Sequence, residues 1–546
     1  MRSLFAVLGL VVIALTAACD SSSHPNLAPD GSSMSGGAGQ GGATGTGGST
    51  AIGTGGMGGS GTLTATGGVV GSGGSTATGG TTTTGGAVAS GGASGGTTGS
   101  GGVTVTVTGG ARASGGTTSS GGVTGTGGTR ASGGRTSNGG VTGSGGTRAS
   151  GGTTGNGGNS SIAAPADNVA ELSADFGLAG IGYVNGLFVT VTVCVPGTSQ
   201  CQSIDHVLVD TGSTGLRLLG SVLTLPLPAS TDDSGVALAQ CLQFVSSNTW
   251  GGLRSADLKI AGEQAKNLVI QVIDESVYPV PSDCTGVSSN TADTLRCNGI
   301  IGVGSFLQDC GAACALPVGG RSANPGMYYK CSSTAKGGCK AAAVPISKQL
   351  WNPIALFSQD NNGTIIELPA VPAEGAASVT GALVFGIGTR DNNALGQAKV
   401  LPLDSIGTFL TRYPANGNST LAFIDSGSNA IFFLDTKTAG IPACTGLYSS
   451  FYCPTSTQNL SATSQDANGL VTMTMNFSIA NARTLFASPT SMVFANLGGP
   501  SVAPSSGGSS MGAYFDWGLP FYFGRNVFTS IEDQAGQPGT GLYVAF

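Results

Sequence analysis

A glycine-rich stretch from about Ala28 to Ser161 sets the strongest limit on what this chain can fold into. It consists of Gly, Ser and Thr with scattered Ala and Val, and residues 121–132 recur as residues 139–150, an 18-residue repeat. Such a sequence buries too little apolar surface to offset its conformational entropy. We therefore expect residues 19–162 to form a disordered, flexible stalk; the alternative is an ordered glycine-rich repeat or an adhesive surface. Any packed core must come from the rest of the chain.

The first 18 residues resemble an export signal. A basic start precedes an apolar run from Leu4 to Leu15 that is too short to span a bilayer comfortably. Small residues then lead to Cys19, a pattern that looks like a bacterial lipobox. We expect removal of residues 1–18, lipidation of Cys19 and a membrane-anchored lipoprotein of the bacterial cell envelope. The alternative is ordinary cleavage near Ala18, with Cys19 an incidental thiol.

The charge balance argues against a nucleic-acid partner. The chain has 21 Lys plus Arg against 27 Asp plus Glu, a net charge of −6, and only 9% of its residues are charged. A protein that binds a phosphate backbone needs a basic field, and this composition offers none.

The cysteines predict disulfides rather than a metal site. Beyond Cys19, eleven cysteines follow residue 190, and exported proteins retain disulfides. Close spacing suggests four local pairs: Cys194 with Cys201, Cys310 with Cys314, Cys331 with Cys339, and Cys444 with Cys453. Because eleven is an odd number, one thiol among Cys241, Cys284 and Cys297 is left unpaired. Zinc usually needs His ligands or CxxC pairs, and neither occurs here, so we expect no metal.

After Asn168 the sequence is typical of an all-β domain. Short apolar alternating runs are separated by Gly, Pro, Asn and Asp, with few segments of helical period. Residues 187–194 and 204–209 are expected to form a hairpin around residues 196–199, across which Cys194 and Cys201 would face each other. The second strand runs directly into Asp210-Thr211-Gly212-Ser213.

The same arrangement returns far downstream, where residues 421–424 lead into Asp425-Ser426-Gly427-Ser428, 425 − 210 = 215 residues later. One such tripeptide usually marks only a turn. Two, each after an apolar strand, indicate more. The strand carries the aspartate to a poorly solvated place, glycine lets amides point at the carboxylate, and the hydroxyl residues hydrogen-bond to it.

If the two turns meet, their chemistry is hydrolytic. Two neighbouring carboxylates share one proton, because like charges at short range cannot both ionise. One can then take a proton from water while the other donates to a peptide carbonyl. The only histidines are His24 and His206, so a Ser-His-Asp or Cys-His site is disfavoured. No cofactor is required.

These residues resemble the pepsin-like aspartic protease family, over most of residues 175–546. The family follows each aspartate turn with a strand of two apolar residues and a glycine, and Ile300-Ile301-Gly302 matches this signature in the first lobe. Residues 381–386 and 400–403 look like the opening of the second lobe. Residues 517–532 and 541–546 resemble the final strands, where the expected glycine is replaced by Pro520.

The resemblance implies a two-lobed, all-β architecture of double-ψ β-barrels. Residues 163–350 would form the N-terminal lobe with a Cys-rich insertion, and residues 351–546 the C-terminal lobe. Asp210 and Asp425 would be the catalytic pair. Around them, Thr211 and Ser426 would brace the turns, Gly212 and Gly427 would allow them, and Ser213 and Ser428 would hydrogen-bond the outer carboxylate oxygens. A flap is expected within residues 243–262, with Trp250 as its aromatic residue.

Two functions are compatible with this pattern. In the first, the chain is a monomeric endopeptidase that cleaves extracytoplasmic polypeptides. In the second, the fold no longer cuts and binds a protein or glycan at the cell surface, because fold does not fix function. In both cases the lipid at the N-terminus provides the membrane contact.

Overall fold

The computed structural model describes residues 98–99, 112–114, 118–119, 130–132, 162–244, 247–318, 324–414, 416–501 and 514–546. The chain divides into two units, one of residues 33–154 and one of residues 1–32 with 155–546. The predicted signal, Cys19 and most of the predicted stalk lie outside the described residues. In the first unit, parallel pairs join β1 (Thr98–Gly99) to β3 (Thr118–Ser119) and β2 (Arg112–Ser114) to β4 (Arg130–Ser132).

The second unit is all-β, as predicted. Its described α-helices have four residues each: α1 (Ala292–Leu295), α2 (Thr436–Ala439) and α3 (Ala482–Leu485). None of the helices in the described ranges has the length and apolar character needed to cross a membrane.

A 15-stranded sheet, in the order β14-β13-β9-β10-β11-β8-β12-β7-β6-β5-β16-β15-β25-β26-β17, forms most of this unit. Its first ten strands along the chain are β5 (Val169–Ala174), β6 (Leu187–Cys194), β7 (Cys201–Asp210), β8 (Thr214–Leu219), β9 (Ala237–Gln243), β10 (Asn248–Ile260), β11 (Glu263–Ile273), β12 (Gly299–Val303), β13 (Tyr328–Cys331) and β14 (Cys339–Ala341). The other five are β15 (Gly363–Glu367), β16 (Val379–Phe385), β17 (Val400–Pro402), β25 (Asn526–Ser530) and β26 (Tyr543–Ala545).

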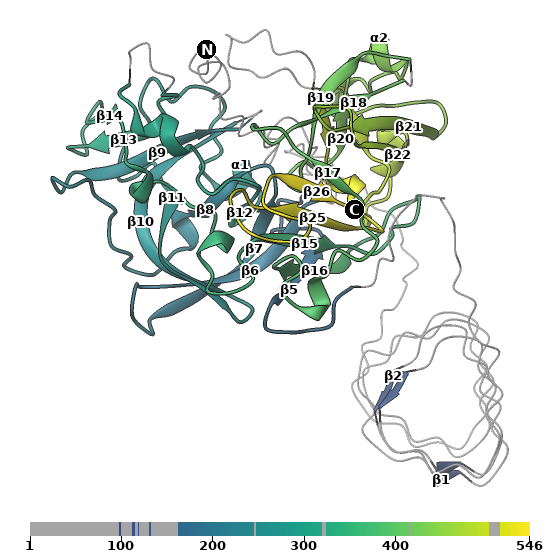
Figure 1. Ribbon diagram of the computed structural model, residues 1–546, viewed down its shortest axis with the longest axis horizontal. Helices are drawn as coiled ribbons and strands as arrows, with labels where there is room; N and C mark the ends of the chain where they lie inside the picture. The colour runs from purple at the N-terminus through teal and green to yellow at the C-terminus, as the bar shows by residue number, and fades with distance from the viewer. Residues whose placement is uncertain are drawn as a thin grey trace, which may run out of the picture. The chain divides into compact units, whose positions relative to one another are not determined.

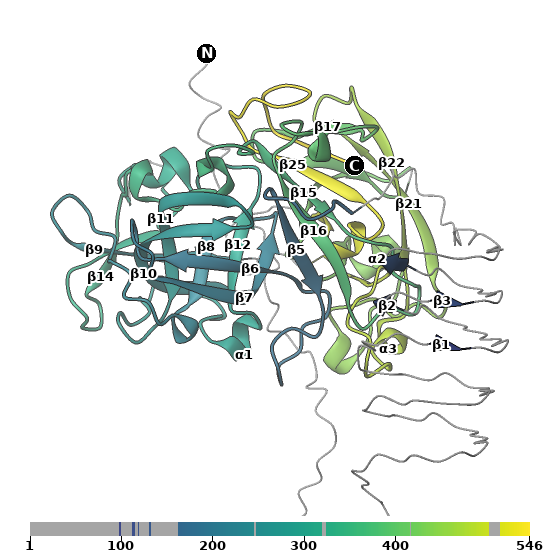
Figure 2. The ribbon, with the colours of Figure 1, turned by 90° about the horizontal axis from the view of Figure 1, so that it is seen from below.

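A second sheet has seven strands in the order β22-β21-β18-β19-β24-β20-β23. Its strands are β18 (Phe409–Arg412), β19 (Ser419–Ile424), β20 (Ile431–Phe433), β21 (Gln458–Gln465), β22 (Thr472–Ile479), β23 (Gly498–Gly499) and β24 (Phe515–Trp517). Figures 1 and 2 show β8–β14 on one side of the unit and β18–β22 on the other, with β15, β16 and β25 between them. This is the expected two-lobed arrangement.

The strands that lead to the two aspartates end inside the core. In β7, Val207, Leu208 and Val209 are completely buried, whereas the first half of the strand is largely exposed. In β19, Ala422 and Ile424 are buried. The chain therefore enters each turn from an apolar interior, which explains why Asp210, the last residue of β7, and Asp425, the residue after β19, are poorly solvated.

Five disulfides join the described cysteines, and the four predicted local pairs are among them. Cys194 and Cys201 are direct partners across the predicted hairpin of β6 and β7. The fifth joins Cys241 of β9 to Cys284, 43 residues later. Cys297 is buried, and its thiol lies 3.4 Å from the carbonyl of Leu295. Five disulfides indicate an oxidising environment outside the cytoplasm.

The glycine expected behind Asp425 is Gly518, and the assignment of that position to Pro520 was wrong. In the first lobe, β12 pairs with β7 so that Ile301 lies opposite Val209 and Gly302 opposite Asp210. In the second, β24 pairs with β19 so that Trp517 lies opposite Ile424, which makes Gly518 the counterpart of Gly302. A Cβ on Gly518 would lie 2.1 Å from the carbonyl oxygen of Ala430.

Pro520 therefore corresponds to Gly304, whose N–H donates to the carbonyl of Ser213 at 2.9 Å. Proline has no N–H to give. The preceding residue, Leu519, supplies the bond instead, and its N–H donates to the carbonyl of Ser428 at 2.7 Å. The two turns thus keep equivalent support despite the different sequences.

A buried ion pair holds β8, β9 and β13 against the loop after β12. Arg217 is completely buried and lies 2.9 Å from Oδ2 of Asp309. Tyr328 donates to Oδ1 of Asp309 at 2.6 Å, and the Gln240 amide donates to Oδ2 at 2.5 Å. Burial raises the pKa of Asp309, and the charge of Arg217 opposes that rise. Each partner compensates a charge that water does not reach.

Gly518→Ala should lower the free energy of unfolding by roughly 1–3 kcal/mol, because the added methyl group meets backbone that must move. Chemical denaturation with the disulfides intact would measure this. Gly539→Ala is the matched control, since a Cβ there meets nothing within 4 Å. Equal stability of the two variants would contradict the close approach.

Asp309→Asn should cost about 3–5 kcal/mol of stability, because it leaves the buried Arg217 charge uncompensated. The same denaturation measurement applies. Asp232→Asn removes the partner of Lys330 in a more exposed pair and should cost much less. A loss at Asp309 no greater than at Asp232 would show that the buried pair is not stabilising.

Candidate active site

The first aspartate turn follows β7 directly. Asp210 is completely buried, and both of its carboxylate oxygens accept local hydrogen bonds. The Gly212 N–H donates to Oδ1 at 2.8 Å, and the Ser213 hydroxyl donates to Oδ2 at 2.5 Å. The residues assigned to this turn from the sequence therefore surround the carboxyl group as the motif requires.

The second turn repeats this geometry after β19. Asp425 is also completely buried. The Gly427 N–H donates to its Oδ1 at 2.8 Å, and the Ser428 hydroxyl donates to its Oδ2 at 2.8 Å. The two halves of the site thus have the same local structure.

Reciprocal hydrogen bonds join the two turns. The Thr211 N–H donates to the Ser426 hydroxyl oxygen at 3.1 Å, and the Ser426 N–H donates to the Thr211 hydroxyl oxygen at 3.0 Å. Each hydroxyl also donates to a carbonyl of the opposite strand, Thr211 to Ile424 at 3.2 Å and Ser426 to Val209 at 2.7 Å. Thr211 and Ser426 therefore contact each other as a symmetric bridge.

This bridge brings the carboxyl groups of Asp210 and Asp425 together, and Oδ1 of each lies beside Gly427. Each also lies against the glycine of the opposite turn. A Cβ on Gly212 would be 2.9 Å from Cγ of Asp425, and one on Gly427 would be 2.7 Å from Oδ1 of Asp210. Only glycine fits at these two positions without displacing the opposite carboxyl group.

The electrostatics favour one shared proton. Burial raises the pKa of Asp210, while hydrogen bonds from Ser213, Asp425 and Gly212 and the charge of Arg217 oppose the rise. Burial raises the pKa of Asp425 well above its ordinary value, and the neighbouring charges of Asp210 and Asp516 raise it further. The two carboxyl groups therefore titrate as a pair, and burial together with their mutual repulsion favours a state with one shared proton.

A small hollow of about 60 Å³ opens beside the turns. It is lined by Gly212 and Ser213 on one side and by Phe423 and Ile424, which precede Asp425, on the other. Thr408 also borders it. This space has room for a few water molecules.

Trp250 does not have the predicted role of a flap aromatic. Residues 237–260 form the hairpin of β9 and β10, so part of the range predicted for the flap is a hairpin strand. However, Trp250 is completely buried, its indole N–H donates to the carbonyl of Tyr278 at 2.6 Å, and its ring packs edge-on against Tyr329. Its place in the strand points it into a small core beside two disulfides.

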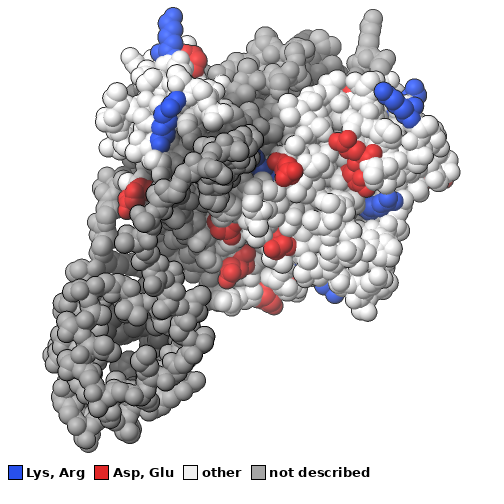
Figure 3. Space-filling view, turned by 180° about the vertical axis from the view of Figure 1, so that it is seen from behind, with Lys and Arg blue, Asp and Glu red and all other residues white. Residues whose placement is uncertain are grey.

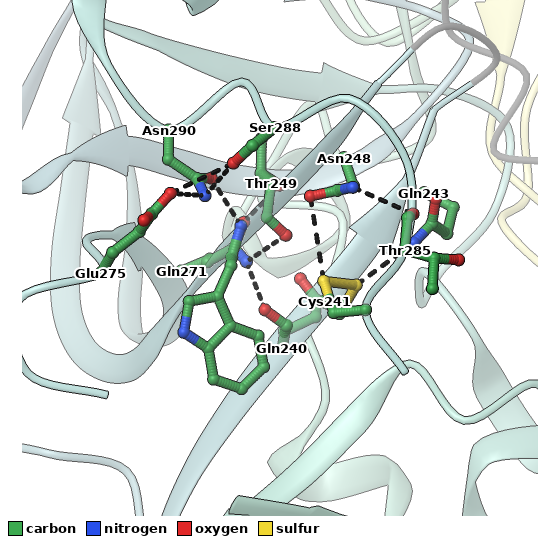
Figure 4. The surroundings of a disulfide bond; sticks show 12 residues. Gln240, Cys241, Gln243, Asn248, Thr249, Gln271, Glu275, Thr285, Ser288 and Asn290 are labelled. Atoms are coloured by element: carbon green, nitrogen blue, oxygen red, sulfur yellow. Dashed lines mark hydrogen bonds between the residues drawn. A yellow bond between two sulfur atoms is a disulfide. The ribbon is translucent and has the colours of Figure 1, made fainter. Parts of the chain in front are cut away.

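The hairpin is anchored near its turn, as Figure 4 shows. Cys241 of β9 is disulfide-bonded to Cys284, and Asn248 of β10 donates to the carbonyl of Thr285 at 3.0 Å. Gln271 of β11 donates to the carbonyl of Gln240 at 2.8 Å. On its other edge, β9 pairs with β13 of the Cys-rich insertion.

Three residues near the pair were missed from the sequence. Arg217 comes from β8, and its positive charge opposes the rise in the pKa of Asp210. The hydroxyl of Tyr522 lies 2.8 Å from that of Thr211. Asp516 lies in the buried strand β24 and raises the pKa of Asp425. Asp516 and Arg217 each left a signal in the sequence, a charged group within an apolar run.

Comparison with known proteins gives one family and a remote structural neighbour. The aspartic proteinase of Irpex lacteus is 14% identical to this chain, with a TM-score of 0.40, and the alignment covers 69% of this chain and 96% of that one. No curated protein matches the chain. The family described as "Protein of unknown function (DUF3443)" matches residues 164–546. Because this match spans more than half of the sequence, the chain belongs to the DUF3443 family.

Proposed function

We propose that this protein is an aspartic-type endopeptidase that hydrolyses peptide bonds with Asp210 and Asp425. One observation carries the proposal. Two carboxyl groups 215 residues apart in the chain, 425 − 210, are completely buried, and the bridge between Thr211 and Ser426 holds them together. Burying two acids against each other is unfavourable for folding alone. A site that activates water needs this arrangement.

The two carboxyl groups have complementary roles in this proposal. Ionised Asp210 accepts a proton from a water molecule, whose oxygen attacks the peptide carbonyl carbon. Protonated Asp425 donates its proton to the carbonyl oxygen, which gives a tetrahedral diol. Asp210 then passes its proton to the amide nitrogen, and the C–N bond breaks as one diol hydroxyl returns its proton to Asp425, so that the pair again holds one proton. The bridge between Thr211 and Ser426 keeps the two carboxyl groups next to each other throughout the reaction.

The substrate would be a polypeptide outside the cytoplasm. Arg and Lys are few, and on the face in Figure 3 uncharged residues cover most of the described surface, with charged side chains in small separate groups. Such a surface offers little to an anionic polymer. The five disulfides support export. We extend the proposal to a lipoprotein held by Cys19, with residues 19–162 as a flexible tether to the envelope and the site working as a monomer.

A second function is favoured by one specific observation. Both carboxyl groups are completely buried, and the neighbouring hollow is only about 60 Å³. A domain that binds a protein or glycan without cleaving it would not need water to reach the pair. The carboxyl pair would then be a structural remnant of a hydrolytic fold.

Asp210→Asn and Asp425→Asn should each reduce cleavage of an unfolded protein at acidic pH by a factor of about 10³ or more, because each removes one role in the proton transfers. The full chain in detergent would be assayed with a labelled casein, with and without a statine-type inhibitor. Asp435→Asn is the control, since Asp435 caps the exposed start of α2. Cleavage unchanged in either site variant would reject this site. A folded wild-type protein that cleaves nothing from acidic to neutral pH would favour the binding function.

A further inference from the structure

A cavity of about 520 Å³ lies apart from the aspartate pair. Its wall comes from residues 162–164, from β15 and the start of β25, and from residues between 391 and 398, which follow β16. None of the residues that line it also lines the hollow beside the two turns. Its volume is typical of sites that hold a small molecule, and the proposed hydrolysis of peptide bonds does not use it.

One face of the central strands forms part of this wall. Ile365 of β15 lies opposite Phe528 of β25, and Glu367 lies opposite Asn526. Side chains two residues apart in a strand point to the same side, so these four side chains share one face of the sheet. All four line the cavity. The cavity therefore has apolar surface directly beside a carboxyl group and an amide.

Glu367 is a buried acid without a cation. It is only 4% exposed, its Oε2 accepts a hydrogen bond from the Ala163 N–H, and its Oε1 accepts one from the Asn526 amide at 3.1 Å. Both donors are neutral, and no Lys, Arg or His in the described ranges forms an ion pair with it. A glutamine oxygen could also accept the bond from Ala163, so anchoring of the chain does not account for the charge. An unpaired carboxylate buried in this way is costly for folding alone.

Arg525 is the reverse case, a cation of the cavity wall without an acid. Its Nη1 donates to the carbonyl of Phe521 at 2.5 Å, and its Nη2 donates to the carbonyl of Asn476 at 3.4 Å. No Asp or Glu in the part of the chain that the structure describes pairs with it. Burial lowers the pKa of Arg525 to about 10, so the group is charged at neutral pH. A guanidinium group has five N–H donors, so donors remain for an anion.

The two charges on the wall do not neutralise each other. Burial raises the pKa of Glu367, and the bond from Ala163 opposes that rise, whereas the charge of Arg525 takes no part in it. The acid and the cation therefore lie well apart. In addition, Oδ1 of Asn526 is buried and has no hydrogen-bond partner among the described residues. The wall thus has acceptors that lack a donor beside Glu367, and donors that lack an acid at Arg525.

We propose that this cavity binds a short peptide with free ends, whose ammonium group pairs with Glu367 and whose carboxylate pairs with Arg525. One molecule then supplies both missing countercharges. A free amino acid carries its two charged groups on a single carbon, whereas a peptide separates them by about 3.3–3.6 Å for each residue. The separation of the two charges on the wall therefore favours a peptide, and its apolar side chains would pack against Ile365 and Phe528. This inference does not depend on the proposed function.

The test is a calorimetric titration of the full chain in detergent, at neutral pH, with the tripeptide Ala-Leu-Ala. The N-acetylated tripeptide and the tripeptide amide each lack one terminal charge. Each should bind about tenfold more weakly or worse, because it leaves one buried charge of the wall unpaired. Glu367→Gln should weaken binding of the free tripeptide by the same factor without weakening the acetylated one further, and Arg525→Gln should do the same with respect to the amide. Glu374→Gln is the matched control, since Glu374 is exposed and lies outside the cavity, and should change nothing.

A saturating statine-type inhibitor separates this cavity from the aspartate pair. Tripeptide binding that the inhibitor leaves unchanged, with the expected losses, would support the site whether or not the protein cleaves polypeptides. Displacement of the tripeptide by the inhibitor would overturn it. Equal binding of the free and acetylated tripeptides, or no binding at a concentration of about 1 mM, would also overturn it. If Glu367→Gln does not fold, the two modified tripeptides decide, because they remove the same charge pairs with the protein unaltered.

Discussion

The reciprocal bridge between Thr211 and Ser426 is the interaction on which the rest of the site depends. Each residue donates its N–H to the other's hydroxyl oxygen and its hydroxyl to the opposite strand. All of these bonds are buried, so breaking them would leave several polar groups without partners. The bridge thereby holds two acids together that would otherwise repel each other. Because the bridge holds the two carboxyl groups at short range, they cannot both ionise and share one proton.

The two turns could be predicted because their determinants are local. An apolar strand, an aspartate, a hydroxyl residue, a glycine and a serine specify each turn within a few positions. The four short-range disulfides were predictable for the same reason, since cysteines 4 to 9 residues apart are close in any hairpin or tight loop. The all-β class followed from the alternation of apolar and polar residues over residues 168–546.

The remaining features depend on contacts that sequence spacing does not encode. Cys241 and Cys284 meet because β9 and the loop before α1 lie together in the folded lobe. Trp250 was assigned to a flap from its neighbours in the sequence, but its strand position turns it toward Tyr329. The role of Gly518 was missed because the expected glycine of the second lobe was placed at Pro520. Only the pairing of β24 with β19 fixes that register. Asp516 was visible as an acid among aromatic residues, yet its influence on the pKa of Asp425 depends on the tertiary fold.

Strand β9 is attached on both of its edges, which limits how the β9–β10 hairpin can move. Hydrogen-bonded ladders to β10 and β13 border this strand, and disulfides cross-link it to residue 284 and close the β13–β14 pair. A hairpin fastened in this way cannot lift by itself without breaking a ladder. Any movement of this hairpin would instead carry β13 and β14 with it, because the ladder and the disulfides join these strands.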